Sequence, residues 1–470
     1  MITLRDYQTA AVDGIRTSYR DGKRSPLLVL PTGGGKTVIF TYIASNTSAR
    51  GKRVLILVHR VELLRQTSAA LSKFNVDHGL INPQFTPDIR SKVQVASVQT
   101  LVRRIDRYAR VFQPDLIVID EAHHATASTW RKILETYPNA HVLGVTATPI
   151  RGDGTGLGKD VGGMFDDLIM GPQVPELIAK GFLVKPIVFA PATRLDLSGV
   201  RIVRGDYDNK ELAARVDKPK ITGDAVDHYR RLCPGAPAVV FCVSIAHAEH
   251  VASEFRAAGY RAYAVDGSME DDQRKRVLAG LGNGSVQVVC SCDLISEGTD
   301  IPAITCAILL RPTQSMGLYI QQVGRALRTL DGKSSAYILD HVGNVLTHGM
   351  PDEIREWSLD GEIKRKKKKK NTEPTMRVKQ CEKCFAVHAP APKCPHCGHV
   401  YAVDGRQLDK EDGELKQITP EQAAMIRRQK QHREVAKART VEELEKIAAA
   451  RGYKPGWVKH VMASREKIQN

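Results

Sequence analysis

Residues 27–37 read LLVLPTGGGKT, an apolar run that passes into a glycine-rich loop and then into an apolar helix. This pattern predicts a strand–loop–helix cradle, in which backbone N–H groups and a helix N-terminus face phosphate oxygens. The predicted cradle residues are Thr32, Gly33, Gly34, Gly35, Lys36 and Thr37. Lys36 would neutralise phosphate charge and the Thr37 hydroxyl would bind Mg²⁺. The general pattern has glycine where this chain has Leu30, so a glycine-rich turn with an incidental lysine is the alternative.

A second apolar run, residues 116–119, ends in Asp120-Glu121-Ala122-His123. An aspartate at a strand end can hold the Mg²⁺ that bridges ATP phosphates, and the adjacent glutamate can orient and deprotonate the attacking water. We therefore predict Asp120 as a metal ligand, Glu121 as a catalytic base and His123 as a residue that couples the γ-phosphate to a second lobe of the protein. The alternative is a pair of solvated carboxylates beside a locally hydrogen-bonded histidine.

Through most of the chain, short apolar runs alternate with segments whose apolar residues recur at helical spacing. This alternation predicts an α/β fold with parallel sheets covered by helices on both faces. The expected strands include residues 27–30, 54–58, 116–119, 142–145, 238–241, 286–290, 307–310 and 336–339. The predicted domains are a first lobe at 1–185, a hinge at 186–220, a second lobe at 221–357, a basic linker at 358–377, a zinc ribbon at 378–402 and a basic helical region at 415–470.

The net charge of +17 predicts a polyanionic partner, either nucleic acid or a membrane surface. From residue 361 to 470, 26 Lys and Arg face 14 Asp and Glu, so most of the excess lies in the last part of the chain. No uninterrupted apolar run approaches the roughly 18 residues of a membrane span, and the amino terminus lacks a secretory signal. These features favour a soluble, cytoplasmic protein without a membrane partner.

Cys381, Cys384, Cys394 and Cys397 form two C-x-x-C pairs separated by nine residues. Two such pairs can place four thiolates around one structural Zn²⁺, and a redox role is the weaker alternative. The other five cysteines lie in apolar segments and are expected to be buried side chains. The ribbon lies between a lysine run at 366–370 and a helix predicted from the capping box Thr440-x-x-Glu443. We expect it to grip DNA, with docking of a recruiting protein as the alternative.

Further segments follow the motif order of superfamily 2 helicases, which the chain resembles over roughly residues 1–345. LRDYQ at 4–8 is similar to the adenine-reading segment, LVHR at 57–60 and SVQT at 97–100 to motifs Ia and Ib, and TATP at 146–149 to motif III. VFCVS at 240–244 resembles motif IV, EGTDIP at 297–302 motif V and QQVGRALR at 321–328 motif VI. The resemblance implies two RecA-like lobes that close on ATP and Mg²⁺.

The resemblance also implies roles for individual residues. Arg5, Gln8, Gly298, Asp300 and Gln321 would bind the nucleotide, and Arg325 and Arg328 would reach its γ-phosphate as arginine fingers. Contacts to the nucleic-acid backbone would come from His59, Arg60, Gln99, Thr100, Ser244 and Thr299.

Within this superfamily, RPTQS at 311–315 and the zinc module look like the RadD-like group of DNA-repair ATPases. The expected activity is that of an ATP-dependent DNA helicase or translocase acting in repair, recombination or replication, as a monomer or weak oligomer. DNA is favoured over RNA as the substrate. The alternatives are a translocase that does not unwind, an RNA helicase and the motor subunit of a restriction system.

Overall fold

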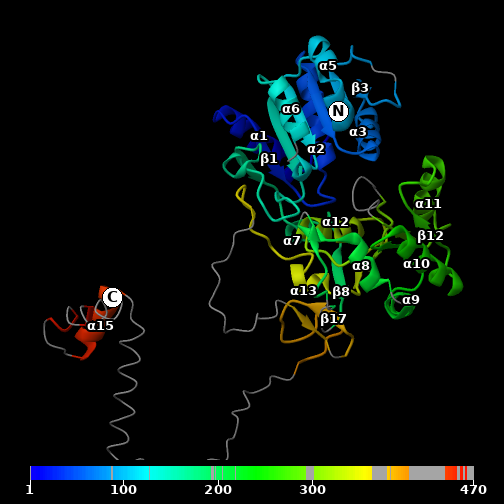
Figure 1. The fold of residues 1–470 in the computed structure, drawn as a ribbon, viewed down its shortest axis with the longest axis vertical. Helices are drawn as coiled ribbons and strands as arrows, with labels where there is room; N and C mark the ends of the chain where they lie inside the picture. Colours follow the sequence, from blue (N-terminus) through cyan, green and yellow to red (C-terminus); the bar gives the residue numbers. More distant parts are fainter. Residues whose placement is uncertain are drawn as a thin grey trace, which may run out of the picture. The chain divides into compact units, whose positions relative to one another are not determined.

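The computed structural model describes residues 2–462, except 86–87, 126–127, 192–194, 196, 204, 218, 293–300, 362–377, 382, 402–439, 452–455 and 459–460. The chain divides into two compact units, Met1–Tyr401 and Ala402–Asn470 (Figure 1). No helix in the described ranges combines the length and apolar character needed to cross a bilayer.

The first lobe is built on a seven-stranded sheet in the order β3-β4-β2-β5-β6-β1-β7, in which every pair is parallel. The strands are β1 (Pro26–Val29), β2 (Val54–Val58), β3 (His78–Ile81), β4 (Val93–Ser97), β5 (Leu116–Asp120), β6 (His141–Thr146) and β7 (Asp167–Met170). All residues of β1, β2, β4 and β5 are buried, because helices cover both faces of a parallel sheet. Leu28 and Leu30 belong to one core cluster and Leu27 and Val29 to another, as alternation along a strand requires.

The first lobe contains seven helices in its described residues, the first of which precedes β1. They are α1 (Asp6–Arg20), α2 (Lys36–Ala49), α3 (Val61–Lys73), α4 (Val98–Arg103), α5 (Ile105–Val111), α6 (Ser128–Thr136) and α7 (Val174–Ala179), with 3₁₀ turns at Ala122–His124 and Lys159–Val161. Figure 1 shows the elements from α1 to α6 of this lobe in blue to cyan, and α7 in green. Because the strands are parallel, the loops that follow their carboxyl ends lie at one edge of the sheet, where ligands of such sheets bind.

The second lobe has an eight-stranded sheet in the order β12-β13-β11-β14-β15-β8-β17-β16. Its strands are β8 (Lys185–Phe189), β11 (Ala238–Phe241), β12 (Ala262–Val265), β13 (Val288–Ser291), β14 (Cys306–Leu309), β15 (Ser335–Asp340), β16 (Lys379–Gln380) and β17 (Ala386–His388). Its helices are α8 (Asn209–Val216), α9 (Pro219–Leu232), α10 (Ile245–Ala257), α11 (Asp271–Asn283), α12 (Met316–Ala326) and α13 (Asn344–His348). The predicted α/β fold with two parallel-sheet lobes is confirmed.

Two predicted boundaries differ from the structure. The segment expected as a hinge, residues 186–220, contains most of β8, a parallel partner of β15 in the second sheet, and also the hairpin strands β9 (Ile202–Val203) and β10 (Asp206–Tyr207). The zinc ribbon was expected as a separate module, but β17 pairs with β8 and extends that sheet. The apolar run of β8 is short and follows Lys185 and Pro186, and its sheet partners β15 and β17 both come from later segments of the chain.

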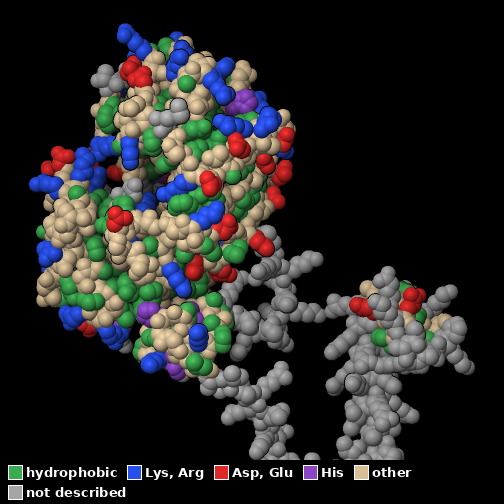
Figure 2. All heavy atoms as spheres, turned by 180° about the vertical axis from the view of Figure 1, so that it is seen from behind, with side chains coloured by type: hydrophobic (Ala, Val, Ile, Leu, Met, Phe, Trp, Pro, Cys, Tyr) green, Lys and Arg blue, Asp and Glu red, His purple; other side chains and the backbone are tan. Residues whose placement is uncertain are grey.

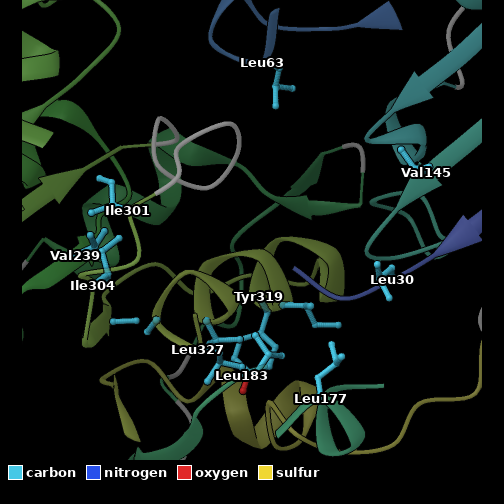
Figure 3. Packing of buried hydrophobic residues seen from close by; sticks show 14 of the residues in the cluster. Leu30, Leu63, Val145, Leu177, Leu183, Val239, Ile301, Ile304, Tyr319 and Leu327 are labelled. Atoms are coloured by element: carbon cyan, nitrogen blue, oxygen red, sulfur yellow. The ribbon is translucent and has the colours of Figure 1, made fainter. Parts of the chain in front are cut away.

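Apolar side chains from α7, β8 and α12 form a continuous core where the two lobes meet. Leu177, Leu183, Tyr319 and Leu327 are buried, and Figure 3 shows them close together beneath α12. The Val184 amide donates to the Leu327 carbonyl at 2.9 Å. The chain segment leaving the first lobe is therefore packed directly on the end of α12.

In the unit Ala402–Asn470, α15 (Val441–Arg451) begins at the predicted capping box. The Glu443 amide donates to Thr440 Oγ1 at 3.2 Å, and the Thr440 amide donates to Glu443 Oε2 at 3.3 Å. The capping-box prediction is therefore confirmed. The lysine run at 366–370 lies outside the described residues.

Candidate active site

The predicted phosphate cradle lies between the end of β1 and the start of α2, which begins at Lys36. Gly33 and Gly35 have φ values of +83° and +85°, a left-handed conformation that glycine adopts without steric cost. A side chain at Gly35 would also overlap the Gln8 amide nitrogen. These two glycines let the loop turn its backbone N–H groups toward a bound phosphate chain.

The segment before α1 is attached to this loop. The Tyr7 hydroxyl donates to the Gly34 carbonyl at 2.9 Å, and Gln8 Nε2 lies 3.5 Å from the same oxygen. The Arg5 guanidinium lies over the Phe182 ring at 4.0 Å and donates to the Tyr7 hydroxyl at 3.2 Å. Arg5 and Gln8 are thus brought to the nucleotide loop, as a base-reading role would require. Phe182 was not predicted, since nothing in the local sequence marks it.

The two predicted carboxylates follow β5. Asp120 is buried at the strand end, and Glu121 Oε1 lies 3.8 Å from Lys36 Nζ, which itself donates to the Leu30 carbonyl at 3.4 Å. Glu121 has φ 48° and ψ 54°, a left-handed conformation that costs a non-glycine residue about 1–3 kcal/mol. Such strain is concentrated at functional positions, and here it turns the carboxylate of Glu121 toward Lys36 of the cradle.

His123 connects this loop to motif III and to the second lobe. Its Nδ1 lies 3.1 Å from Thr146 Oγ1 and 3.5 Å from Glu121 Oε2, and Gln321 Nε2 lies 3.2 Å from its Nε2. Because the amide nitrogen of Gln321 can only donate, Nε2 accepts and the ring proton is assigned to Nδ1, which donates to Thr146. The hydroxyl of Thr146 donates onward to the Thr148 carbonyl at 2.9 Å. This chain of hydrogen bonds joins both lobes beside Glu121, the predicted catalytic base.

Helix α12 carries the motif VI residues and packs on the phosphate cradle. A Cβ placed on Gly324 would lie 2.8 Å from Thr32 Cβ, and one placed on Gly33 would lie 3.4 Å from Arg328 Cγ. Only a glycine at position 324 allows this approach. Arg325 is buried near the end of α12, and Arg328 lies two residues beyond the end of the helix. The structure therefore brings motif VI against the loop that contains Lys36.

Lys333, which was not predicted, forms hydrogen bonds at the end of motif VI. Its Nζ donates to the carbonyls of Arg328, Ile304 and Pro302 at 2.7, 2.6 and 3.3 Å. Burial of the ammonium group, together with the charge of Arg328, lowers the pKa of Lys333 to about 8. Lysine near a helix C-terminus is common, but this one also joins motif VI to the end of motif V.

The predicted nucleic-acid contacts are only partly brought together. Gln99 Nε2, at the start of α4, donates to the His59 carbonyl at 3.1 Å, so motifs Ia and Ib are neighbours. The His59 ring lies 4.1 Å from that of His124, which was not among the predicted site residues. Ser244 caps α10 by accepting from the His247 amide at 3.1 Å, a structural role that its residue type also explains. Gly298, Thr299 and Asp300 lie outside the described residues.

The four ribbon cysteines meet the geometric requirement for a Zn²⁺ site. Their sulfur atoms all lie within 4.8 Å of one another, with Cys381–Cys397 at 3.6 Å and Cys384–Cys394 at 3.7 Å. A tetrahedron with Zn–S distances of about 2.3 Å has edges of about 3.8 Å. The donor set and spacing thus fit structural zinc. Mg²⁺ fits Thr37 and Asp120 by donor type, since a hydroxyl and a buried carboxylate flank the cradle.

Two family models match the chain. Residues 1–151 match "Type III restriction enzyme, res subunit", and residues 224–329 match "Helicase conserved C-terminal domain". A Lactococcus phage 51.5 kDa protein is 34% identical over 80% of this chain and 78% of its own length. A candidate ATP-dependent helicase of Saccharomyces cerevisiae, IRC3, is 31% identical over 72% of this chain. The chain belongs to the superfamily 2 helicases.

Some similar proteins are longer than the region that they share with this superfamily 2 helicase. The chain covers 51% of the yeast relative. The structure of the ATP-dependent Type ISP restriction-modification enzyme LlaBIII bound to DNA matches 72% of this chain and 27% of that chain, with a TM-score of 0.55 and 20% identity. At this level of identity, the likeness is evidence for the fold of this superfamily 2 helicase and not for its activity.

Proposed function

We propose that this chain is an ATP-dependent DNA translocase whose two lobes close on ATP and convert hydrolysis into movement along DNA. The packing of α12 on the phosphate cradle, with Gln321 bonded to His123, carries this proposal. The cradle and Glu121 come from the first lobe, whereas Arg325 and Arg328 come from the second. Hydrolysis in such a site depends on closure, because charge on the transferred phosphoryl group is stabilised only when both halves are present.

The residues divide the reaction between them. Lys36 and the backbone of the glycine loop would hold the β- and γ-phosphates, with Thr37 and Asp120 as ligands of Mg²⁺, which neutralises phosphate charge when bound. Glu121 would orient the attacking water and accept its proton. Arg5 and Gln8 would contact the base. Through its hydrogen bond with Gln321, His123 would couple nucleotide binding in the first lobe to the position of the second lobe.

The DNA substrate is supported by the charge of the chain and by its relatives. The net charge is +17, and a Sulfurisphaera tokodaii relative that is 23% identical to this chain is described as a DNA 3'-5' translocase. Figure 2 shows Lys and Arg side chains spread over this face of the unit Met1–Tyr401, several of them beside its central hollow. Contacts from motifs Ia and Ib to the DNA backbone would confer no preference for particular bases.

The test is ATP hydrolysis with no polynucleotide, single-stranded DNA, forked DNA and RNA, with Lys36→Ala as the blank. Stimulation by DNA that weakens with salt and vanishes in the blank is expected. Stimulation by RNA alone would contradict the DNA assignment. Unwinding of forked duplexes, measured next, separates a helicase from a translocase that does not unwind.

The motor subunit of a restriction system is a second candidate. The family model matched by residues 1–151 is described as the res subunit of a type III restriction enzyme. Co-purification of a methylase or nuclease with the tagged full chain would favour this function. DNA-stimulated hydrolysis by the purified chain alone, with no such companion, would favour the independent motor. The finer resemblance to the RadD-like group stays a prediction.

The bond between His123 and Gln321 is expected to couple the lobes. His123→Ala and Gln321→Ala should each lower the polynucleotide-stimulated kcat, and the double variant should be little worse than either one. A hydrogen bond between them contributes about 0.5–1.5 kcal/mol, so the double-mutant cycle should show coupling of that size. Fully additive effects on kcat would show that the pair does not act as a unit.

Removal of zinc is expected to release the ribbon from the second sheet. A module with so little core depends on its metal to fold, so a chelator should abolish the pairing of Val387 with Val188. Hydrogen exchange of the peptides covering 185–190 and 378–401 should increase, with the first-lobe edge strand β3 as the internal control. Unchanged exchange after complete loss of zinc would rule out a structural metal.

A further inference from the structure

Phe385 adopts a left-handed backbone conformation, which is unfavourable for phenylalanine. It directly follows Cys384, has φ 61° and is 56% exposed. The equivalent position in the second C-x-x-C pair is Gly398, with φ 74°. Glycine accepts this left-handed conformation without cost, whereas a residue with a Cβ does not. The ribbon therefore carries an exposed aromatic ring where its own second turn has glycine.

The ring borders a pocket of about 670 Å³ between the ribbon and the second lobe. Phe189 and Leu232 contribute apolar surface, and Arg231, Lys383 and Gln380 contribute polar groups. Arg231 comes from the end of α9 and Lys383 from the ribbon, and both side chains are exposed. Two cations and a flat apolar ring thus face one space from two different elements.

The contacts that dock the ribbon fix this arrangement. Gln380 Nε2 donates to the Ala190 carbonyl at 2.7 Å, and the His396 ring meets Phe189 edge-on at 5.9 Å. Asp340 is the acid that lines the pocket, but it is buried and its carboxylate accepts the amides of Val345 and Val342 at 2.7 and 3.3 Å. Among the described lining residues, the exposed charge is therefore positive.

We propose that this pocket binds one unpaired nucleotide of the DNA on which the motor acts, with its base stacked on Phe385 and its phosphates paired with Lys383 and Arg231. The inference rests on the proposed function and adds a binding site outside the two-lobe interface. An aromatic platform beside backbone-binding cations is the combination that holds single strands without sequence preference. A ring that served only to cover the metal would be buried, and Phe385 is exposed.

The decisive variant is Phe385→Gly in the full, zinc-loaded chain, because glycine suits this backbone conformation and should leave the ribbon folded. Anisotropy of a labelled single-stranded oligonucleotide should show affinity reduced roughly 5- to 150-fold, the effect of losing one stacked base. Phe385→Trp should restore binding. Tyr263→Ala, which removes another exposed aromatic ring of the second lobe, is the matched control and should bind as the parent does.

Zinc content and melting temperature identify any variant that loses its fold. If Phe385→Gly loses zinc, Arg231→Gln replaces it as the test variant, because Arg231 lies outside the ribbon. This variant should bind the oligonucleotide more weakly, and its affinity should depend less on salt. A photoactivated 5-iodouracil oligonucleotide should attach to the peptide that contains Phe385.

Unchanged affinity in the zinc-loaded Phe385→Gly chain would overturn this inference while leaving the motor intact if DNA still stimulates hydrolysis. Reduced binding of an acidic peptide with unchanged DNA affinity would also overturn it and assign the pocket to a protein partner. Failure of any polynucleotide to stimulate the parent chain would instead refute the proposed function, whatever Phe385 does.

Discussion

Replacing Arg325 with alanine is expected to reduce the kcat of ATP hydrolysis by roughly 10³–10⁵-fold, the largest effect predicted for any single residue. Arg325 is buried on α12, whose Gly324 packs against Thr32 of the phosphate cradle. Its charge would stabilise the equatorial oxygens of the γ-phosphoryl group in the transition state, so the loss should appear in kcat much more than in the affinity for ATP.

Single-turnover hydrolysis and ATP binding, measured separately with saturating DNA, test this assignment. Arg230→Ala is the matched control, since Arg230 is an exposed second-lobe arginine that forms an ion pair with Asp227 of its own helix. Arg325→Lys retains charge but loses the planar fork and should recover only part of the rate. A kcat near that of the parent in Arg325→Ala would place the arginine finger elsewhere, with Arg328 as the next residue to replace.

Glu121→Gln is expected to lower kcat by roughly 10²–10⁴-fold, because the amide retains the size of the carboxylate but cannot accept the proton of the attacking water. Glu121 lies 3.8 Å from Lys36 in this structure, so the substitution also removes a negative charge from the cradle. ATP affinity should therefore stay the same or increase. The two effects together distinguish a base from a residue that only shapes the loop.

Rapid-quench measurement of phosphate release, paired with equilibrium binding of a non-hydrolysable ATP analogue, provides both quantities. Glu135→Gln, an exposed acid of the same lobe, should leave both unchanged. If Glu121→Gln hydrolyses ATP at the parental rate, another group must activate water. A simultaneous loss of analogue binding would instead indicate that Glu121 supports the structure of the cradle.

The fold class was predictable because its signals are local. A fully buried parallel strand reads as a short apolar run, and the runs at 27–30, 54–58, 116–119 and 238–241 correspond closely to β1, β2, β5 and β11. The apolar run within β8 was assigned to the hinge, because a segment rich in charged residues, 196–220, follows it and its strand partners come from β15 and the ribbon. Pairing between distant segments has no local signature.

In the candidate site, too, some residues could be recognised from local sequence and others could not. Glycine at 33 and 35 and the carboxylates at 120 and 121 were recognisable, since phosphate binding requires particular residue types at fixed spacing. Phe182 and Lys333 were not, because a phenylalanine beside Arg5 and a lysine beside three carbonyls have meaning only through the residues that fold against them. The nucleic-acid contacts were the weakest predictions, and Ser244 has a capping role in the structure.

The sequence by itself determined the two α/β lobes, the phosphate cradle and the cysteine cluster, because each depends on residue type and short spacing along one segment. Only the tertiary structure decided that Gly324 packs on Thr32, that Gln321 meets His123 and that the ribbon extends the second sheet through β17. These contacts join residues far apart in the chain. Their geometry follows from the packing of complete helices and sheets, which no short stretch of sequence specifies.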